Sequence, residues 1–165
     1  MKKHSIIILI LLLSVYNKLT GQVLKDSELF RKLKFQDSIF FEQSFNRCDI
    51  NYLENAIDKE LTFYHDKSGI QNRDKFLENT KKYICGDTLK KPIRKVEEQS
   101  LEVFPMYNNN VLYGAVQTGI HSFFIREKNK ADVLTGRAKF IHLYLLVNEK
   151  WVLKEVISFD HQLPN

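Results

Sequence analysis

One aspartate and four histidines are the side chains whose types and positions point to chemistry. Asp37 falls near the middle of the apolar arc of a predicted amphipathic helix, where a carboxylate is costly unless it is paired or hydrogen-bonded. The histidines lie in or beside segments with the pattern of β-strands: His65, His121, His142 and His161. Histidine with aspartate is a common general acid–base couple. If the strands face the helix, these side chains form an acid–base site.

The candidate catalytic set is Asp37, His121 and His142. The alternative is a hydrogen-bonded core pair, because buried polar groups are nearly always satisfied by partners. The His-Asp pair at 65–66 and the Asp-His pair at 160–161 lie near strand ends, where we expect them to shape a turn or the rim of a pocket.

A metal or another cofactor is not predicted. HxH, HExxH and CxxC spacings, a Gly-rich phosphate loop and a GxSxG elbow are all absent from the sequence. Glu155 with two histidines on neighbouring strands would make a facial triad, but Glu155 fits a solvent-facing position equally well. Cofactor-free chemistry is therefore the expectation.

Residues 1–21 have the pattern of a secretory signal. Lys2 and Lys3 precede an apolar run over 6–13, and Gly21 lies near the expected cleavage point. The run is shorter than the roughly 20 residues that span a bilayer, although an uncleaved anchor is the alternative. We therefore predict a single domain over residues 22–165 that is exported, periplasmic or secreted, and without a stable membrane anchor after cleavage.

The charge of the chain argues against a nucleic-acid partner. Without residues 1–21 the 25 basic residues become 22 against 20 acids, so the formal charge falls from +5 to +2. The segment KKPIRK at 90–95 is the one local basic cluster, and we expect it to be a solvated loop. Cys48 and Cys85 are the only cysteines, and export permits a disulfide, but two buried thiols are the favoured expectation.

Three helical segments come first and a strand meander follows. Asp26 is a candidate N-cap for SELFRKLKFQDSIFFEQSFNR, Asp49 for DINYLENAI, and Asn72 for RDKFLENTKKYI. The strands are ELTFYHD, QSLEVFPMY, VLYGAVQTGIHSFFIR, GRAKFIHLYLLV and WVLKEVISFDH. This order predicts an α+β fold, an antiparallel sheet with the helices on one face.

The short connection at 148–149 sets a register for the last two strands. A two-residue hairpin turn places His142 opposite Glu155 and Tyr144 opposite Leu153. Closing the connection at 126–137 about its middle then places His121 opposite His142. The resulting face is aromatic with a few polar groups, as in a ligand pocket. Its predicted lining residues are His65, Tyr113, Gln117, Phe123, Phe140, Tyr144, Trp151, Glu155 and His161.

The opposite face of the sheet is aliphatic. It carries Val116, Ile141, Leu143, Leu145 and Val152 by the same register. Because the helices cover one face only, a homodimer through this second face is the simplest way to bury it.

The order of these segments resembles the nuclear transport factor 2-like superfamily, and within it the SnoaL-like branch of exported bacterial proteins. The resemblance spans about residues 25–162 and is carried by FNRCD, ELTFYHDKSG and GRAKFIHLYLLVNEKWVLKEVISFDH. It implies a curved sheet that forms a cone with the helices, an internal pocket and frequent dimers. It implies no single activity, because the fold serves isomerases, dehydratases, hydrolases, transport factors and assembly domains.

Two members of the superfamily suggest roles for the polar residues. Scytalone dehydratase uses a carboxylate on the first helix with histidines on the sheet, which by position in the fold implies like roles for Asp37, His121 and His142. Steroid isomerases pair a carboxylate base with tyrosine donors, which implies Asp37 with Tyr113 or Tyr144. Related sequences usually have glycine where this chain has Glu149.

Two functions follow. The first is an exported domain that binds a small molecule or a partner through a pocket lined by aromatic side chains and histidines, with the ligand unknown. The alternative is a cofactor-free lyase or isomerase that uses Asp/His acid–base chemistry on a small polar-aromatic or carbonyl substrate. The burial of Asp37 and His142 distinguishes the two functions. A closed core around these residues favours binding elsewhere or no site at all.

Overall fold

The computed structural model describes residues 21–164. The predicted signal sequence lies outside the described residues except for Gly21. Within the described span, no helix combines the length and apolar character needed to cross a membrane.

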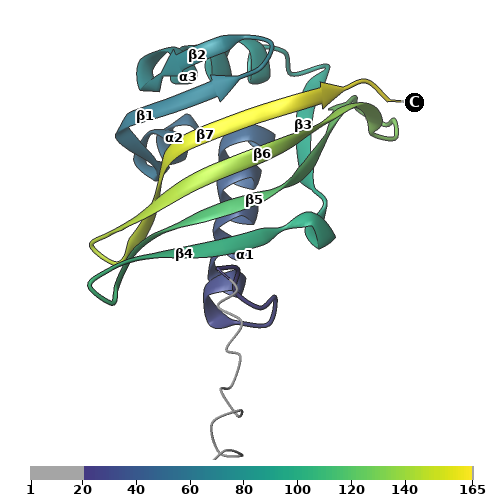
Figure 1. Cartoon of the computed structure of the whole chain (residues 1–165). Helices are drawn as coiled ribbons and strands as arrows, with labels where there is room; N and C mark the ends of the chain where they lie inside the picture. Colours follow the sequence, from purple (N-terminus) through teal and green to yellow (C-terminus); the bar gives the residue numbers. More distant parts are fainter. Residues whose placement is uncertain (1–20, 165) are drawn as a thin grey trace, which may run out of the picture.

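The first helix lies across the inner face of the sheet. Helix α1, Glu28–Phe41, begins after Ser27, whose side chain accepts a hydrogen bond from the backbone N–H of Phe30 at 3.2 Å. The predicted cap, Asp26, is thus one residue too early. A π-helical turn, η1 (Glu42–Asn46), continues the helix. Figure 1 shows α1 behind β5 and β6, so its apolar side packs against the sheet.

The other two helices begin where the sequence predicted. Asp49 caps α2 (Ile50–Ala56) and Asn72 caps α3 (Arg73–Asn79), each through a side-chain oxygen that accepts a backbone N–H. A second π-helical turn, η2 (Thr80–Ile84), extends α3. Such caps satisfy N–H groups that a helix start leaves free, which explains why these boundaries can be read from the sequence.

Seven strands form one curved sheet in the order β2-β1-β7-β6-β5-β3, with β4 also paired to β5. The strands are β1 (Ile57–His65), β2 (Gly69–Asn72), β3 (Lys91–Val96), β4 (Glu102–Asn108), β5 (Val111–Arg126), β6 (Val133–Val147) and β7 (Lys150–Gln162), with a 3-10 turn η3 (Glu98–Ser100) before β4. β1 pairs with β7 in parallel, so the sheet is mixed rather than purely antiparallel as predicted. No hairpin joins these two strands, and therefore no turn sets their relative direction.

The basic segment at 90–95 is a strand and not the solvated loop that was predicted. Lys91–Val96 form β3, which pairs with β5, and Arg94 is only 3% exposed. The charge pattern was misleading because the alternation of a strand sends Arg94 inward while Lys95 faces solvent.

The hairpin between β6 and β7 has the predicted two-residue turn. Asn148 and Glu149 both have positive φ, 48° and 63°, as a tight hairpin requires. Tyr144 pairs with Leu153 as predicted.

A bulge then changes the register of β7. Leu143, not His142, pairs with Glu155, and His142 pairs with Val156. Lys154 is the additional residue, and its ammonium group binds Asp58 and Glu60 at 3.0 and 2.9 Å. The predicted pairing of His142 with Glu155 is therefore wrong, and Glu155 lies on the outer face instead of in a pocket.

The pairing predicted between His121 and His142 is also wrong. Gln117, four positions earlier on β5, pairs with His142, while His121 pairs with Ala138. Because the displacement is an even number of residues, both histidines still face the interior.

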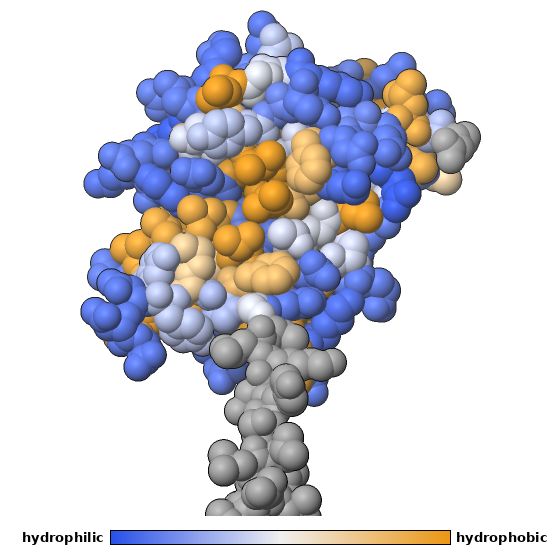
Figure 2. Space-filling model, in the orientation of Figure 1, coloured by the Kyte–Doolittle hydropathy of each residue, from blue (hydrophilic) through white to orange (hydrophobic). Residues whose placement is uncertain are grey.

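The outer face of the sheet is apolar, as predicted. Register places Phe104, Val116 and Leu143 side by side across β4, β5 and β6. Figure 2 shows hydrophobic side chains gathered over this face, which is the face turned away from α1. Tyr64 of β1 and Ile157 of β7, which pair with each other, are 37% and 36% exposed.

A disulfide joins the two cysteines, so the expectation of two thiols is wrong. Cys48 and Cys85 have Cα atoms 5.7 Å apart and link the segment after η1 to the end of η2. Beside them the ammonium group of Lys91 donates to the carbonyls of Phe45 and Ile84 at 2.6 and 3.1 Å. Both links tie the helices to each other at one end of the cone.

Candidate functional site

A buried ion pair occupies the centre of the cone. Arg94 Nη1 lies 2.6 Å from Asp37 Oδ2, and Arg94 Nη2 lies 3.1 Å from Asp37 Oδ1. Both side chains are almost fully enclosed, at 2% and 0% exposure. The geometry is bidentate, which makes it a strong charge-assisted contact.

Local structure explains why the pair meets. Asp37 lies one helical turn from Leu33 and Phe40, which are both buried, so the helix period carries it inward. Arg94 comes from the opposite side on β3, and its guanidinium lies 3.6 Å from the ring centre of Phe41. The aromatic ring and the carboxylate together compensate the buried positive charge.

Three polar side chains surround the ion pair without full partners. Among residues 21–164, no hydrogen-bond partner exists for either ring nitrogen of His142, for the hydroxyl of Tyr144 or for Oε1 of Gln117. His142 Nδ1 is 3.5 Å from Asp37 Oδ1, an ion-pair distance without hydrogen-bond geometry. Each unsatisfied buried group costs about 1–3 kcal/mol.

Burial keeps these groups neutral. Burial, assisted by the positive charge of Arg94, holds the pKa of His142 well below its usual value. Burial likewise raises the pKa of Tyr144 well above its usual value, with the carboxylate of Asp37 adding to the effect. The centre thus contains one ion pair and neutral neighbours.

This centre has no room for a substrate. His142, Tyr144, Gln117 and Asp37 all have 0% exposure. His142 is also sandwiched by rings, because Phe41 and Phe140 stack on it at centroid distances of 5.6 and 4.3 Å. The interior that the resemblance assigned to a pocket is filled by the protein's own side chains.

A chain of polar contacts leads from the centre to the rim. Arg94 Nε donates to His121 Nδ1 at 3.2 Å, and His121 Nε2 lies 3.5 Å from Ser158 Oγ. Burial first, and the charge of Arg94 second, lower the pKa of His121 far below its usual value, so the ring is neutral. His121 therefore does not contact Asp37 directly, and Arg94 lies between them.

The chain continues to an aspartate at the end of β1. Ser158 Oγ lies 3.3 Å from His161 Nε2, and His161 Nδ1 lies 2.5 Å from Asp66 Oδ1. The backbone N–H of His161 also donates to Asp66 Oδ2 at 3.1 Å. Asp66 and His161 are thus the best-aligned Asp/His pair of the described chain.

His65 shapes the adjoining turn. Its Nδ1 accepts the backbone N–H groups of Lys67 and Ser68 at 3.1 and 3.3 Å, and its ring stacks on that of His161 at 4.3 Å and 17°. His65, Asp66 and His161 have potential metal-ligand atoms within 4.8 Å of one another. In this structure, however, His65 Nδ1 accepts two backbone N–H groups and His161 Nδ1 contacts Asp66, so these nitrogens already have partners.

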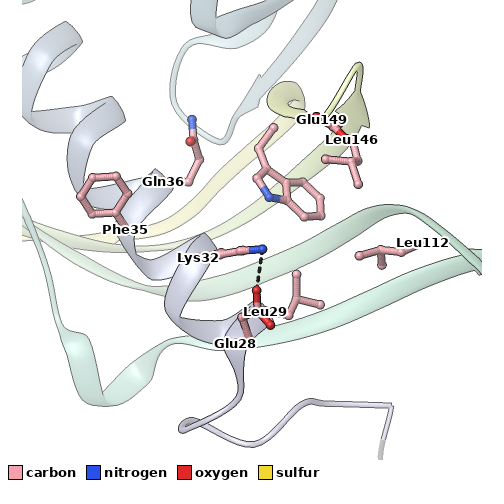
Figure 3. A pocket seen from close by; sticks show the side chains of 9 residues that line it. Glu28, Leu29, Lys32, Phe35, Gln36, Leu112, Leu146 and Glu149 are labelled. Atoms are coloured by element: carbon pink, nitrogen blue, oxygen red, sulfur yellow. Dashed lines mark ion pairs between the residues drawn. The ribbon is translucent and has the colours of Figure 1, made fainter.

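A groove between α1 and one end of the sheet is lined by Trp151. It has a volume of about 770 Å³ and lies between α1 and the ends of β5, β6 and β7. Figure 3 shows Phe35, Gln36 and Lys32 on the helix side, with Leu112, Leu146 and Glu149 on the strand side. Its lining is Glu28, Leu29, Lys32, Phe35, Gln36, Leu112, Leu146, Glu149 and Trp151.

The predicted site residues therefore separate into several places. Gln117, Phe140 and Tyr144 lie in the closed centre, while Phe123 lies near the rim, 6.1 Å from His161 between ring centres. Tyr113 is 41% exposed and does not reach the centre.

Three important residues were not among the predicted site residues. Arg94 falls in the segment predicted to be a loop, and Ser158 is turned inward by a bulge in β7 that has no sequence signature. Phe35 had a readable signal: it is a large apolar residue outside the apolar arc of its helix, and it is 67% exposed.

Comparison with known proteins bears on the fold. No protein-family model and no curated protein matches the chain. Among solved structures, ActVI-ORFA from Streptomyces coelicolor is similar over 82% of this chain and 98% of its own, with a TM-score of 0.68 and 9% identity.

Two further structures carry the fold name. A nuclear transport factor 2-like superfamily protein from Salmonella enterica matches 84% of this chain and 94% of its own, with a TM-score of 0.57 and 15% identity. An NTF2-like protein of unknown function from Shewanella oneidensis matches 79% and 98%, with a TM-score of 0.53 and 18% identity. The chain therefore has the α+β fold of the nuclear transport factor 2-like proteins.

Proposed function

We propose that the protein is an exported domain of the SnoaL-like branch that binds a small, largely apolar molecule in the Trp151 groove. One observation carries this: the groove is hollow while the centre of the cone is filled. Its volume of about 770 Å³ lies within the range of roughly 300–1,000 Å³ that is usual for small-molecule sites. Leu29, Leu112, Leu146 and Trp151 supply apolar contact.

The polar groups at the edge of the groove favour a ligand with one charged or polar end. Lys32 and Glu28 form an ion pair at 2.7 Å, and both are largely exposed. A second depression of about 370 Å³ shares Gln36, Glu149 and Trp151 with the groove. An elongated ligand can therefore extend past Trp151 from one depression into the other while its polar end remains in water.

Export has one supporting feature in the fold. The Cys48–Cys85 disulfide belongs to the kind of bond that persists in oxidising compartments outside the cytosol. The closed centre gives no support to a lyase or isomerase acting through Asp37, His121 and His142, since a base must reach the proton that it removes.

Intrinsic fluorescence tests the proposal, because Trp151 is the only tryptophan of the sequence. The probe is anilinonaphthalene sulfonate, which combines an apolar ring system with an anionic group that suits Lys32. We expect saturable binding with energy transfer from Trp151 to the probe. Phe35→Ala should weaken binding several-fold, whereas Tyr83→Ala removes an aromatic ring that is 63% exposed elsewhere and should change nothing.

Two results would contradict the proposal. One is probe binding without energy transfer from Trp151, and the other is equal affinity in the Phe35→Ala protein. A change of Trp151 fluorescence with protein concentration alone would assign the groove to a second copy of the chain instead.

A further inference from the structure

Ser158, His161 and Asp66 have the mutual contacts of a hydrolytic triad at the rim of the cone. Ser158 Oγ faces His161 Nε2 at 3.3 Å, and His161 Nδ1 faces Asp66 Oδ1 at 2.5 Å. We propose that these three residues form a nucleophilic site that hydrolyses small esters through an acyl-serine. The site shares no residue with the Trp151 groove, so this activity is separate from ligand binding there.

The contacts behind Ser158 fix the direction of every hydrogen bond. A guanidinium only donates, so Arg94 Nε makes His121 Nδ1 an acceptor and leaves the proton of this neutral ring on Nε2. His121 Nε2–H then points to Ser158 Oγ, at 3.5 Å. The serine hydroxyl is left to donate to His161 Nε2, and His161 Nδ1–H donates to Asp66. This is the tautomer that a histidine general base requires.

A strained backbone residue brings Ser158 and His161 together. In a regular strand, residues three apart point to opposite faces. Asp160, between them, has a φ of 58°, which redirects the strand and turns His161 inward beside Ser158. Lys139 and Gln162 hold the Asp160 carboxylate at 2.9 and 3.0 Å. Such strain in a non-glycine residue costs about 1–3 kcal/mol and is concentrated at functional sites.

The acid of the triad is held in place by the main chain. Asp66 N–H donates to the carbonyl of Ser158 at 3.1 Å, and Asp66 Oδ2 accepts the N–H of His161 at 3.1 Å. The carboxylate is thus fixed to the strand that carries the other two residues, and it can stabilise a positive charge on the imidazole without moving.

The reaction balances with water as the only co-reactant. Ser158 Oγ bonds to the ester carbonyl carbon while its proton passes to His161 Nε2, and Asp66 stabilises the imidazolium. The carbonyl electron pair moves to oxygen. The C–O bond to the alcohol then breaks, and His161 returns the proton to the leaving alkoxide. Water, deprotonated by His161, cleaves the acyl-serine to acid and free Ser158.

The surroundings of Ser158 limit the substrate. The residue is 4% exposed. The rings of His65 and Phe123 are both nearly parallel to that of His161, at centroid distances of 4.3 and 6.1 Å. This small exposed area restricts the proposal to substrates with short acyl groups such as acetyl.

The test uses the purified protein, a fluorophosphonate probe and para-nitrophenyl acetate. We expect one covalent adduct, which peptide mapping by mass spectrometry locates on Ser158. Ser158→Ala should lower kcat/KM for the acetate at least about 100-fold. The matched control is Ser122→Ala, which removes a similarly buried serine that bonds Glu97 at 2.9 Å and should retain the rate.

The outcomes separate a serine nucleophile from mere histidine reactivity. Absence of an adduct on Ser158 overturns the proposal, and this result needs no variant to fold. Hydrolysis by folded Ser158→Ala at the unmodified rate also overturns it, because a histidine would then be the acyl acceptor. Asp66→Asn should reduce the rate and shift its pH profile, while probe binding at Trp151 should stay the same.

Discussion

Arg94 holds both carboxylate oxygens of Asp37, at 2.6 and 3.1 Å, and neither side chain is more than 2% exposed. Two charges that are this deeply enclosed depend on each other, because either one alone would be an unpaired charge in a medium of low polarity. The pair joins α1 to β3, so it also links the first helix to the edge of the sheet.

Removing one member of this pair should destabilise the protein strongly. Asp37→Asn or Arg94→Met alone should lower the free energy of unfolding by about 3–5 kcal/mol. The double variant should lose less than the sum of the two, since it leaves no unpaired charge. Urea denaturation of the four proteins forms the test cycle, and additive losses would show that the two side chains do not interact.

Tyr144→Phe should stabilise the protein. The Tyr144 hydroxyl is buried, and it has no hydrogen-bond partner within residues 21–164. Its removal should therefore raise the free energy of unfolding by about 1 kcal/mol. Tyr107→Phe, at a residue 59% exposed, is the control and should be neutral. A loss of stability in Tyr144→Phe would mean that the hydroxyl has a bound partner in solution.

Stability should fall as the pH drops below about 6.5. Burial lowers the pKa values of His121 and His142 in the folded protein. At a pH below about 6.5 these histidines therefore bind protons in the unfolded chain but not in the folded one. More protons on the unfolded state means that stability rises with pH in this window. Each histidine should contribute a slope of about 1.4 kcal/mol per pH unit between its unfolded and folded pKa.

Urea denaturation between pH 7.5 and 5 measures this slope. Most carboxylates titrate below this pH range, so they contribute little to the slope. His142→Gln should reduce the slope of stability against pH by the contribution of one histidine. A wild-type stability that is level from pH 7.5 to 5 would contradict buried neutral histidines.

The apolar outer face should join two copies of the chain, and we propose a homodimer. Leu143 lies between Val116 and Glu155 on this face, so Leu143→Asp should give a monomer or an unfolded chain. Leu89→Asp, at a residue 79% exposed in a loop, is the control and should leave the assembly intact. Sedimentation at micromolar concentration decides, and a stable monomer of the unmodified protein would refute the interface.

Loss of the disulfide should cost about 3–4 kcal/mol. Cys48 and Cys85 are 37 residues apart, and a closed loop of this size restricts the unfolded chain by about that amount. The Cys48→Ser/Cys85→Ser protein should therefore unfold at a lower urea concentration than the unmodified protein. Reductant should lower the unfolding concentration of the unmodified protein only. If reductant lowers the unfolding concentration of both proteins equally, the disulfide is not the cause of the change in stability.

Local signals in the sequence were sufficient for much of the secondary structure. Asp49 and Asn72 cap the helices that were assigned to them, because a cap acts within three residues. The hairpin at Asn148 and Glu149 was also predictable, since its length alone defines the register of the pair next to it. The inward position of Asp37 followed from helix periodicity.

Only the tertiary structure decided what these side chains contact. The bulge at Lys154 and the positive φ of Asp160 determine which residues of β7 face inward, and neither has a signature in the local sequence. The partner of Asp37 came from a segment that reads as a charged loop until β5 pairs with it. Periodicity therefore determined which residues could turn inward, whereas contacts between distant segments determined that Arg94 closes the centre and that Ser158 meets His161.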